Sequence, residues 1–467
     1  MSVSPDAPSL RYVLERPSPF EDYVIGFVAA SLGMSALRVE PGGGDPVLYR
    51  GESPPDGPRG IVVAPRAGDP IWPELLDGRL NATDMPAIVP FDLVGAIGSF
   101  LTDTVNASRG SEARDRHGRL HFEASFQAER GVAELPIVNV YVRALGELIA
   151  RELGVQPRPI WPAGKRAAIG LSHDVDRPMK WGILRAFGSG RLPRPSGLPH
   201  FAAKTLYTGL QRIRSGSRDD YWLFDEILEA ETARGFRSTF FFASMPAFGA
   251  WGTPNDVYYD IGWPRFTPVF RHLTDAGFGI GLHASFEAHR GVERFRVERE
   301  RLAGLSGSDV PGLRHHFWHL GRFEAATLRM HEAAGFSYDA SIAFNDHLGF
   351  RRNVALPYRP WDATLGRPLR TLQLPTFCMD GHLFYAGSSV DHALAELDRY
   401  LAAVKDCGGF GAIDWHVRTS IPANREFRHW GEAYLAILDH LAADDELWVT
   451  SLDEVAARAG RVDPNVA

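Results

Sequence analysis

Short apolar runs alternate with segments of helical spacing along residues 165–455. The predicted strands are Ala167–Ser172, Ser238–Ser244, Gly279–Ser285, Gly312–Phe317, Ser337–Ile342, Thr371–Phe377, Gly411–Val417 and Leu447–Ser451. The predicted helices between them are Tyr221–Gly235, Phe266–Gly277, Phe295–Leu305 and Ala325–Gly335. Continuously apolar strands are typical of parallel sheets covered on both faces, so the alternation predicts βα units. We therefore expect an α/β fold, a distorted (β/α) barrel of seven or eight strands over residues 165–460.

The first 160 residues have a different pattern, in which short apolar runs are separated by proline and glycine. The predicted elements are a strand at Gly60–Pro65 and helices at Phe91–Leu101 and Val138–Leu153. The closely spaced prolines of residues 157–164 resist both helix and sheet, and they predict a linker. We expect a smaller α/β domain of unknown function over residues 1–160, preceding the barrel.

One segment, Arg177–Asp219, interrupts the alternation directly after the first predicted strand of the barrel. It is rich in arginine, glycine, proline and serine. Two interpretations stay open. The segment is either a surface insertion or a lid over the site, since long loops on the functional face of a barrel often cover the substrate.

Polar side chains recur at one position of the βα units, at or just after the C-terminal end of a predicted strand. They are Asp174, Asp176, His283, Arg314, His316 and His416. This rim is where (β/α) barrels carry their chemistry, and residues with scattered structural roles would not all occupy it. The sequence therefore predicts that these side chains meet at one end of the barrel.

Asp174 and Asp176 stand at positions i and i+2 of an extended segment, so their side chains point the same way. Two like charges held together are unfavourable unless a metal ion or an arginine neutralises them. The pair is therefore typical of a catalytic base next to a metal ligand. The alternative is that both aspartates cap the segment that follows.

Composition narrows the classes of function. The formal net charge of −7 and the lack of a long basic block argue against a dedicated nucleic-acid binder. The two cysteines, Cys378 and Cys407, are far apart and give neither a disulfide framework nor a thiolate metal site. The chain has no pattern of a secretory signal and no uninterrupted apolar stretch of membrane-spanning length, so we expect a soluble cytoplasmic protein.

Five segments at predicted strand ends occur in the order of the motifs of a known family. They are Leu171–Asp176, Ser238–Phe242, Gly281–Glu287, Gly312–Phe317 and Trp415–His416. In this order they resemble the polysaccharide deacetylases (carbohydrate esterase family 4), with the first segment similar to the family's Asp-x-Asp variant. The resemblance covers nearly all of residues 165–455. The N-terminal part resembles a domain of unknown function that precedes a divergent branch of this family.

The resemblance implies roles in hydrolysis for four residues. Asp174 matches the catalytic base that takes a proton from the attacking water, and Arg314 matches the arginine that orients it. His416 matches the general acid that protonates the leaving amine, and the backbone N–H of Phe317 matches the oxyanion donor. A carboxylate base and a histidine acid form a coherent pair for hydrolysis near neutral pH.

The resemblance also implies a divalent metal, Zn²⁺ being the expected ion, bound by Asp176 and His283. The third ligand is open, because Glu287 stands where the family has its second metal-binding histidine. Glu287 lies one helical turn beyond His283 and is a candidate. The other candidate is His316, which occupies the place of a proline in the family's motif. His289 is a third candidate, ranked after these two. An Asp/His/Glu set and an Asp/His/His set both suit Zn²⁺.

Three further polar or aromatic residues are candidates for the substrate pocket. Asp414 stands where the family has an apolar residue near the acetyl methyl, and a buried carboxylate there would disfavour that methyl. Asp339 either pairs with Arg314 or caps a strand end. Trp415 is expected to form a wall of the pocket, since indole has no acid–base role near neutral pH.

The combined interpretation is a metal-dependent hydrolase that removes an N-linked acyl group, acetyl being the expected one, from an amino sugar of a glycan or glycan precursor. Aromatic residues near strand ends, such as Trp222, Trp318 and Trp415, favour a sugar. One alternative is a C–N hydrolase that acts on a non-sugar amide. The other is a catalytically inactive barrel that only binds glycans.

Overall fold

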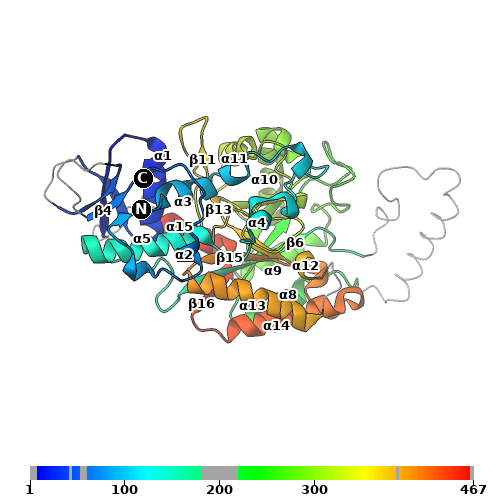
Figure 1. The fold of residues 1–467 in the computed structure, drawn as a ribbon. Coiled ribbons are helices and arrows are strands. Elements are labelled where there is room, and N and C mark those ends of the chain that lie inside the picture. The colour runs from blue at the N-terminus through cyan, green and yellow to red at the C-terminus, as the bar shows by residue number, and fades with distance from the viewer. Residues whose placement is uncertain (1–7, 41–44, 53–59, 181–218, 385–388, 463–467) are drawn as a thin grey trace.

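The computed structural model describes residues 8–40, 45–52, 60–180, 219–384 and 389–462 (Figure 1). Most of the insertion expected at Arg177–Asp219 lies outside these residues, so neither interpretation of it is decided. No helix within the described residues is long and apolar enough to cross a membrane.

The N-terminal unit, residues 8–153, is built on a parallel sheet of five short strands. Its strands are β1 Ser9–Leu14, β2 Ser35–Arg38, β3 Val47–Arg50, β4 Gly60–Val63 and β5 Ile88–Val89, in the order β2-β1-β3-β4-β5. Its longer helices are α1 Pro19–Ser31, α3 Leu93–Leu101 and α5 Ile137–Leu153. The two predicted helices are present within a few residues, but only β4 of the five strands was predicted from the sequence.

The second part of the chain forms one large parallel sheet. Its strands are β6 Ala167–Val175, β7 Thr239–Phe242, β8 Gly279–Ala284, β9 Gly312–His315, β10 Tyr338–Asp339, β13 Leu372–Gln373, β14 Thr376–Met379, β15 Phe410–Asp414 and β16 Leu447–Ser451. The order is β13-β10-β9-β8-β7-β6-β15-β14, and β16 pairs with the first half of β6. Its longer helices are α8 Phe224–Thr232, α9 Phe266–Asp275, α10 Val292–Ser306, α11 Glu324–Ala333, α13 Val390–Asp406, α14 Arg428–Ala442 and α15 Leu452–Val462.

The sheet curls round because its two edges meet in one stretch of chain. β13 pairs with β10, and β14, which begins three residues after β13 ends, pairs with β15. Between them Leu374 donates its backbone N–H to Asp339 O (2.9 Å), and Pro375 O accepts from Ala412 N (2.9 Å). The single strand predicted at Thr371–Phe377 is therefore two, interrupted at a proline that has no N–H to donate. The result is the expected distorted (β/α) barrel.

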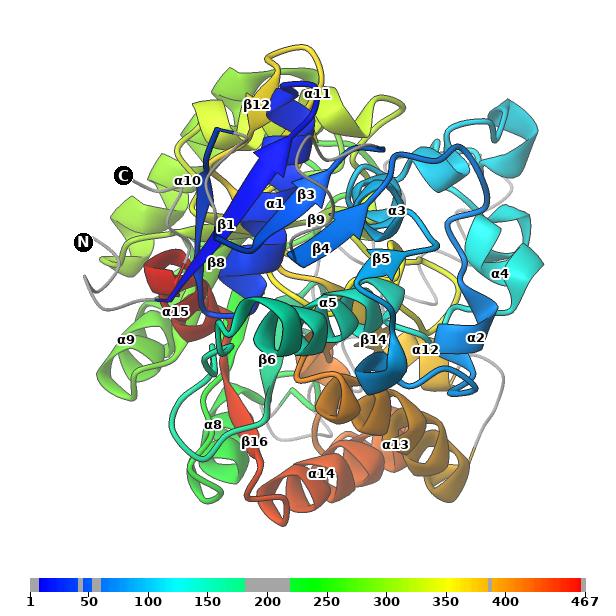
Figure 2. The same cartoon turned by 60° about the vertical axis from the view of Figure 1, so that its left-hand side comes forward.

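The N-terminal unit and the barrel share one apolar core. A single buried cluster runs from Val24 and Leu145 in helices of the N-terminal unit to Tyr338 and Leu374 of the barrel. The interface also has paired polar contacts. Buried Asn139 on α5 donates to Ala355 O (2.8 Å) and accepts from Ala355 N (2.9 Å). Figure 2 shows the small sheet and α5 lying over one side of the barrel. We propose that residues 1–160 and 165–460 are two domains joined by this core.

Candidate metal centre and active site

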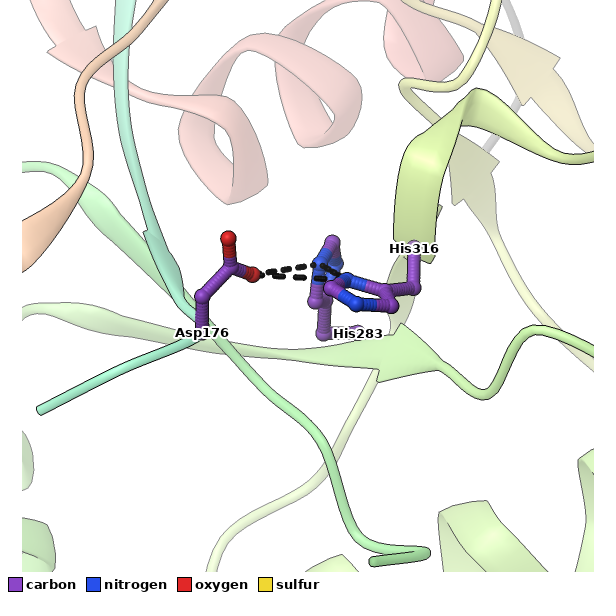
Figure 3. A group of neighbouring side chains, drawn as sticks. All are labelled: Asp176, His283 and His316. Atoms are coloured by element: carbon purple, nitrogen blue, oxygen red, sulfur yellow. Dashed lines mark hydrogen bonds and ion pairs between the residues drawn. The ribbon is translucent and has the colours of Figure 1, made fainter. Parts of the chain in front are cut away.

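Three side chains from three strands of the barrel point their donor atoms at one another (Figure 3). Asp176 follows β6, His283 lies in β8, and His316 follows β9. Asp176 Oδ1 is 3.2 Å from His283 Nε2 and 3.3 Å from His316 Nδ1, and the two nitrogens are 2.8 Å apart. Tetrahedral Zn²⁺ with bonds near ~2.0–2.1 Å separates its ligand atoms by about 3.3 Å. The three donors therefore stand close to the spacing that a zinc ion requires.

The chemistry of these donors also fits a cation. The two imidazole nitrogens face each other, so at most one can carry the hydrogen between them, and the other turns a lone pair into the same space. Apart from these two imidazole nitrogens, the buried Asp176 Oδ1 has no hydrogen-bond partner among the described residues. Burial by itself raises the pKa of Asp176, but His416 and His316 hold that pKa well below its ordinary value. An ionised carboxylate beside two imidazoles is a ligand set that suits Zn²⁺.

Glu287, the other candidate for the third ligand, does not belong to this group. It precedes a short 3₁₀ turn, Ala288–Arg290, and its carboxylate forms an ion pair with Arg290. The described residues form two groups of possible metal donors. One contains Asp176, His283 and His316, the other contains Asp174, Asp414 and His416, and Glu287 is in neither. His289 is also directed elsewhere, with its ring 4.5 Å from that of His319.

Arg314 links two buried carboxylates beneath the metal donors. Its Nη1 donates to Asp174 Oδ1 (2.9 Å) and to Asp414 Oδ1 (2.7 Å), and its Nη2 donates to Ser172 Oγ (2.9 Å). The guanidinium carbon lies 4.5 Å from the centre of the Phe241 ring. Burial lowers the pKa of Arg314, but Asp414 and Asp174 outweigh it and raise that pKa. The arginine is therefore a fixed cation that orients Asp174.

One carboxylate oxygen of Asp174 accepts a hydrogen bond from Arg314, and the other points toward the donor atoms of Asp176, His283 and His316. Its Oδ2 lies 3.7 Å from His283 Nε2. Burial raises the pKa of Asp174, but His283 and Arg314 outweigh it and lower that pKa. An ionised, oriented carboxylate at this place can accept a proton from a water molecule bound between Asp176 and His283.

The structure favours one of the two expected roles of Asp339, the strand-end cap, and changes the expected role of Asp414. Asp339 does not pair with Arg314, since its Oδ1 accepts from the backbone and side chain of Ser341. Asp414 is the second partner of Arg314, and it is fully buried rather than exposed to a substrate. Burial and the neighbouring Asp174 raise the pKa of Asp414 well above its ordinary value. Asp414 is therefore a buried partner of Arg314.

His416 lies beside Asp174 and Asp176, its ligand atom within 4.8 Å of one in Asp174. Its Nε2 lies 3.1 Å from Asp176 Oδ2, and its Nδ1 lies 2.9 Å from Asp380 Oδ1. Asp380 is itself held by the backbone N–H of His416 (3.0 Å) and by the hydroxyl of Thr419. Burial lowers the pKa of His416, but Asp380 and Asp176 outweigh it and raise that pKa well above its ordinary value. The histidine is therefore suited to hold a proton and release it.

Two further residues belong to this site. Asp380 directly follows β14, so it stands at a strand end like the others. Arg418 was not identified. Its Nη1 is buried without a hydrogen-bond partner among the described residues and lies 3.6 Å from Asp176 Oδ2. Its position two residues after His416 was the available signal.

Phe317 and Trp415, both expected to touch the substrate, differ in exposure. Phe317 is 40% exposed, and its ring lies 4.6 Å from that of His316. Trp415 is fully buried, packs against Tyr434 and donates its indole N–H to Thr419 O (3.2 Å). The expectation that Trp415 forms a pocket wall is therefore corrected, because the side chain of a residue after a strand can turn into the helical layer as well as toward the rim.

No family model matches the chain, and no curated protein sequence matches it. The chain is similar in fold to solved deacetylase structures. One is described as a probable polysaccharide deacetylase from Pseudomonas aeruginosa PAO1, at 18% identity and a TM-score of 0.44 over 66% of this chain and 96% of that one. A peptidoglycan deacetylase from Bacillus subtilis has 12% identity and a TM-score of 0.32 over 65% and 96%. A CE4 family pseudoenzyme from Bacillus anthracis has 11% identity and a TM-score of 0.31 over 62% and 66%.

Proposed function

We propose that this protein is a metal-dependent hydrolase that removes an N-linked acyl group, with acetyl expected, from an amino sugar of a glycan or glycan precursor. The observation that carries the proposal is the convergence of the Asp176, His283 and His316 donor atoms, with Asp174 3.7 Å from His283 and His416 3.1 Å from Asp176. A metal ligand set flanked by a proton acceptor and a proton donor is an arrangement typical of hydrolases.

Each residue then has a defined task. A divalent metal bound by Asp176, His283 and His316 would supply Lewis-acid chemistry and lower the pKa of a bound water toward ~7. Asp174, oriented by Arg314, takes the proton of the attacking water. His416, with Nδ1 held by Asp380, gives its Nε2 proton to the nitrogen that leaves. We assign the oxyanion contact to the backbone N–H of Phe317, which follows His316 directly.

Two features bear on the substrate. The exposed ring of Phe317 beside His316 supports a sugar, because an aromatic face can stack on a sugar ring. Arg418 supports a substrate with an anionic group, whether or not it is a sugar. Its Nη1 lies 3.6 Å from Asp176 Oδ2 and has no hydrogen-bond partner among the described residues. A non-sugar amide with an anionic group therefore remains the second candidate. The inactive barrel was suggested by the missing second histidine, and the position of His316 argues against it.

Elemental analysis and an assay of acyl release test the proposal together. Full-length protein should contain about one zinc per chain and release acetate from at least one member of a panel of N-acetylated amino sugars and glycans. Asp174→Asn protein should not release it. Bound zinc with hydrolysis of simple amides alone would favour the non-sugar alternative. Glycan binding without metal or hydrolysis would favour the inactive barrel.

A further inference from the structure

A compact loop of the N-terminal unit, Arg114–Leu120, reaches the rim of the barrel beside the metal donors. Its two ends form an antiparallel bridge, and Asp115 closes the turn by accepting from His117 N (2.8 Å) and Arg119 N (3.0 Å). Gly118 within the turn has φ +81°, a conformation that glycine adopts without strain. The conformation of the loop is therefore held by its own hydrogen bonds.

Arg119 carries the contact from this loop to the barrel. Its Nε donates to Asp115 Oδ2 (2.7 Å), which fixes the guanidinium within its own loop. Its Nη1 donates to the backbone oxygen of Phe317 (2.6 Å) and to the side chain of Asn345. The side chain is only 14% exposed. One arginine thus joins the N-terminal unit to the residue that directly follows His316.

The turn that Arg119 holds is strained. Phe317 and Trp318 have φ of +59° and +52°, in the left-handed region that bulky residues rarely adopt. Such a conformation persists only where the surrounding structure over-determines it. The strained pair starts immediately after His316, so its conformation constrains the backbone on the C-terminal side of His316. Trp318 also covers Arg314, with the guanidinium carbon 5.1 Å from its ring centre.

A second contact of the same loop reaches the segment after β8, the strand that carries His283. The ring of His117 packs edge-on against Phe286 at 5.1 Å and lies 6.0 Å from Phe317. Phe286 comes three residues after His283, and its backbone N–H donates to Asp256 (2.7 Å). The loop therefore touches the segments that follow both β8 and β9, the two strands that carry the histidine donors.

We propose that Arg119 is a positioning residue, through which the N-terminal unit holds the strained Phe317–Trp318 turn and so keeps His316 in the metal site. The N-terminal unit is then part of the active site and not a separate module. This inference rests on the metal site of the proposed function but not on its substrate. Without Arg119 the turn relaxes toward ordinary backbone angles, and the His316 ring moves away from Asp176 and His283.

The test is a measurement of Zn²⁺ affinity on full-length protein by competition with a chromophoric chelator. Arg119→Ala should bind Zn²⁺ about 10- to 100-fold more weakly than the wild type, the range typical for residues that support a metal ligand. Arg143→Ala is the matched control, because Arg143 also donates from the N-terminal unit to a barrel carbonyl, Asp406 O (2.9 Å), at the end of α13. The control should keep wild-type Zn²⁺ affinity.

Adding Phe317→Gly to Arg119→Ala separates positioning from a merely structural role. Glycine adopts a positive φ without strain, so the double variant should recover part of the lost Zn²⁺ affinity. Loss of a general interface contact would not be recovered this way. If Arg119→Ala is insoluble, Arg119→Lys takes its place, since one ammonium donor cannot hold Phe317, Asn345 and Asp115 together as the guanidinium does.

Each outcome decides the inference. The inference is overturned if Arg119→Ala (or Arg119→Lys, where that variant is used instead) binds Zn²⁺ as tightly as the wild type. It is also overturned if Arg143→Ala loses as much Zn²⁺ affinity as the Arg119 variant. A loss that Phe317→Gly does not reduce also overturns it. Wild-type protein that binds no Zn²⁺ overturns the metal site and this inference together. Zn²⁺ binding without acyl release overturns the proposed function alone.

Discussion

Nδ1 of His316 lies 2.8 Å from Nε2 of His283, although the two histidines come from different βα units and neither is part of a local metal-binding motif with the other. The register of the neighbouring strands explains the meeting. β8 and β9 pair His283 with Arg314, so His316 stands two residues further toward the rim. The turn after β9 then brings its ring back over His283.

This relationship predicts which residue completes the metal site. His316→Ala should weaken Zn²⁺ affinity by more than the ~10–100-fold typical of supporting residues, because a ligand itself is removed. Glu287→Ala should change the affinity little, since that carboxylate pairs with Arg290. Titration of both variants with Zn²⁺ decides between them. A large loss in Glu287→Ala with none in His316→Ala would place the third ligand at Glu287.

Asp174→Asn should retain Zn²⁺ binding and lose turnover. The amide can still accept a hydrogen bond from Arg314 but cannot take a proton from water. General base catalysis typically contributes ~10²–10⁴-fold in rate, and kcat should fall by about that factor. Zinc content measured beside kcat separates this effect from loss of metal. Near-wild-type turnover would remove Asp174 from the reaction.

Asp380→Asn should lower kcat while zinc content stays at the wild-type level. Asp380 holds Nδ1 of His416, and its charge raises the pKa of that histidine. The amide keeps the shape but removes the charge and permits the wrong tautomer, so we expect a loss within the ~10²–10⁴-fold range of general acid catalysis. Asp362→Asn, at a buried aspartate outside this site, is the control for non-specific effects on folding. Equal kcat in wild type and Asp380→Asn would contradict the assignment.

Arg418→Gln should weaken binding of anionic ligands more than neutral ones. A hydrogen bond to a charged group contributes roughly 1.5–3 kcal/mol, so the KM of a carboxylate-bearing substrate should rise about 10- to 100-fold. The KM of a neutral N-acetylated amino sugar should change little. The comparison needs the same variant with both substrates. An equal rise in both KM values would show that Arg418 maintains the structure of the site and does not discriminate between anionic and neutral substrates.

Glu298 predicts a pH dependence of stability that is independent of metal. Its carboxylate is buried on α10 and accepts from Ser285 N (2.9 Å) and Trp251 Nε1 (2.8 Å). Burial raises its pKa from 4.5 to about 7. Between these two values the folded state binds more protons than the unfolded chain, so stability falls as the pH rises through that interval.

The measurement is the free energy of unfolding in urea at pH 5 and pH 8 for wild type and Glu298→Gln. The variant should lose a pH-dependent part of order 1–3 kcal/mol, because glutamine does not titrate. A pH dependence that is the same in both proteins would mean that Glu298 titrates near its ordinary value.

Much of the candidate site was predictable from sequence, because its polar residues stand at or just after the C-terminal ends of apolar strands. All eight predicted strands of the barrel overlap observed ones. A buried parallel strand needs a continuous apolar run, and such a run can be recognised in the sequence alone. Asp176, His283 and His316 were chosen because they end such runs, and the structure brings them together. The N-terminal sheet was mostly missed, because strands as short as β5, with two residues, leave too little pattern to detect.

The partner of each polar side chain was decided by strand order and register. Asp414 pairs with Arg314 because β15 lies beside β6, with Asp414 level with Ser172. Asp380 reaches His416 because β14 lies on the other side of β15, with Met379 level with Asp414. Neither relationship is local, since Arg314 and Asp414 are 100 residues apart in the chain. The apolar pattern of a strand indicates that the strand is buried, but it does not identify which other strand pairs with it.

The sequence by itself determined the residue types at the rim, because chain direction and the two-residue period of a strand place them there whatever the neighbours are. Only the tertiary structure decided that His316 stands in the metal group and Glu287 outside it. That choice depends on the left-handed turn at Phe317, which Arg119 contacts from a loop 198 residues earlier in the chain. Left-handed backbone conformations are unfavourable for bulky residues such as Phe317, so the local conformational preferences of the sequence do not predict them.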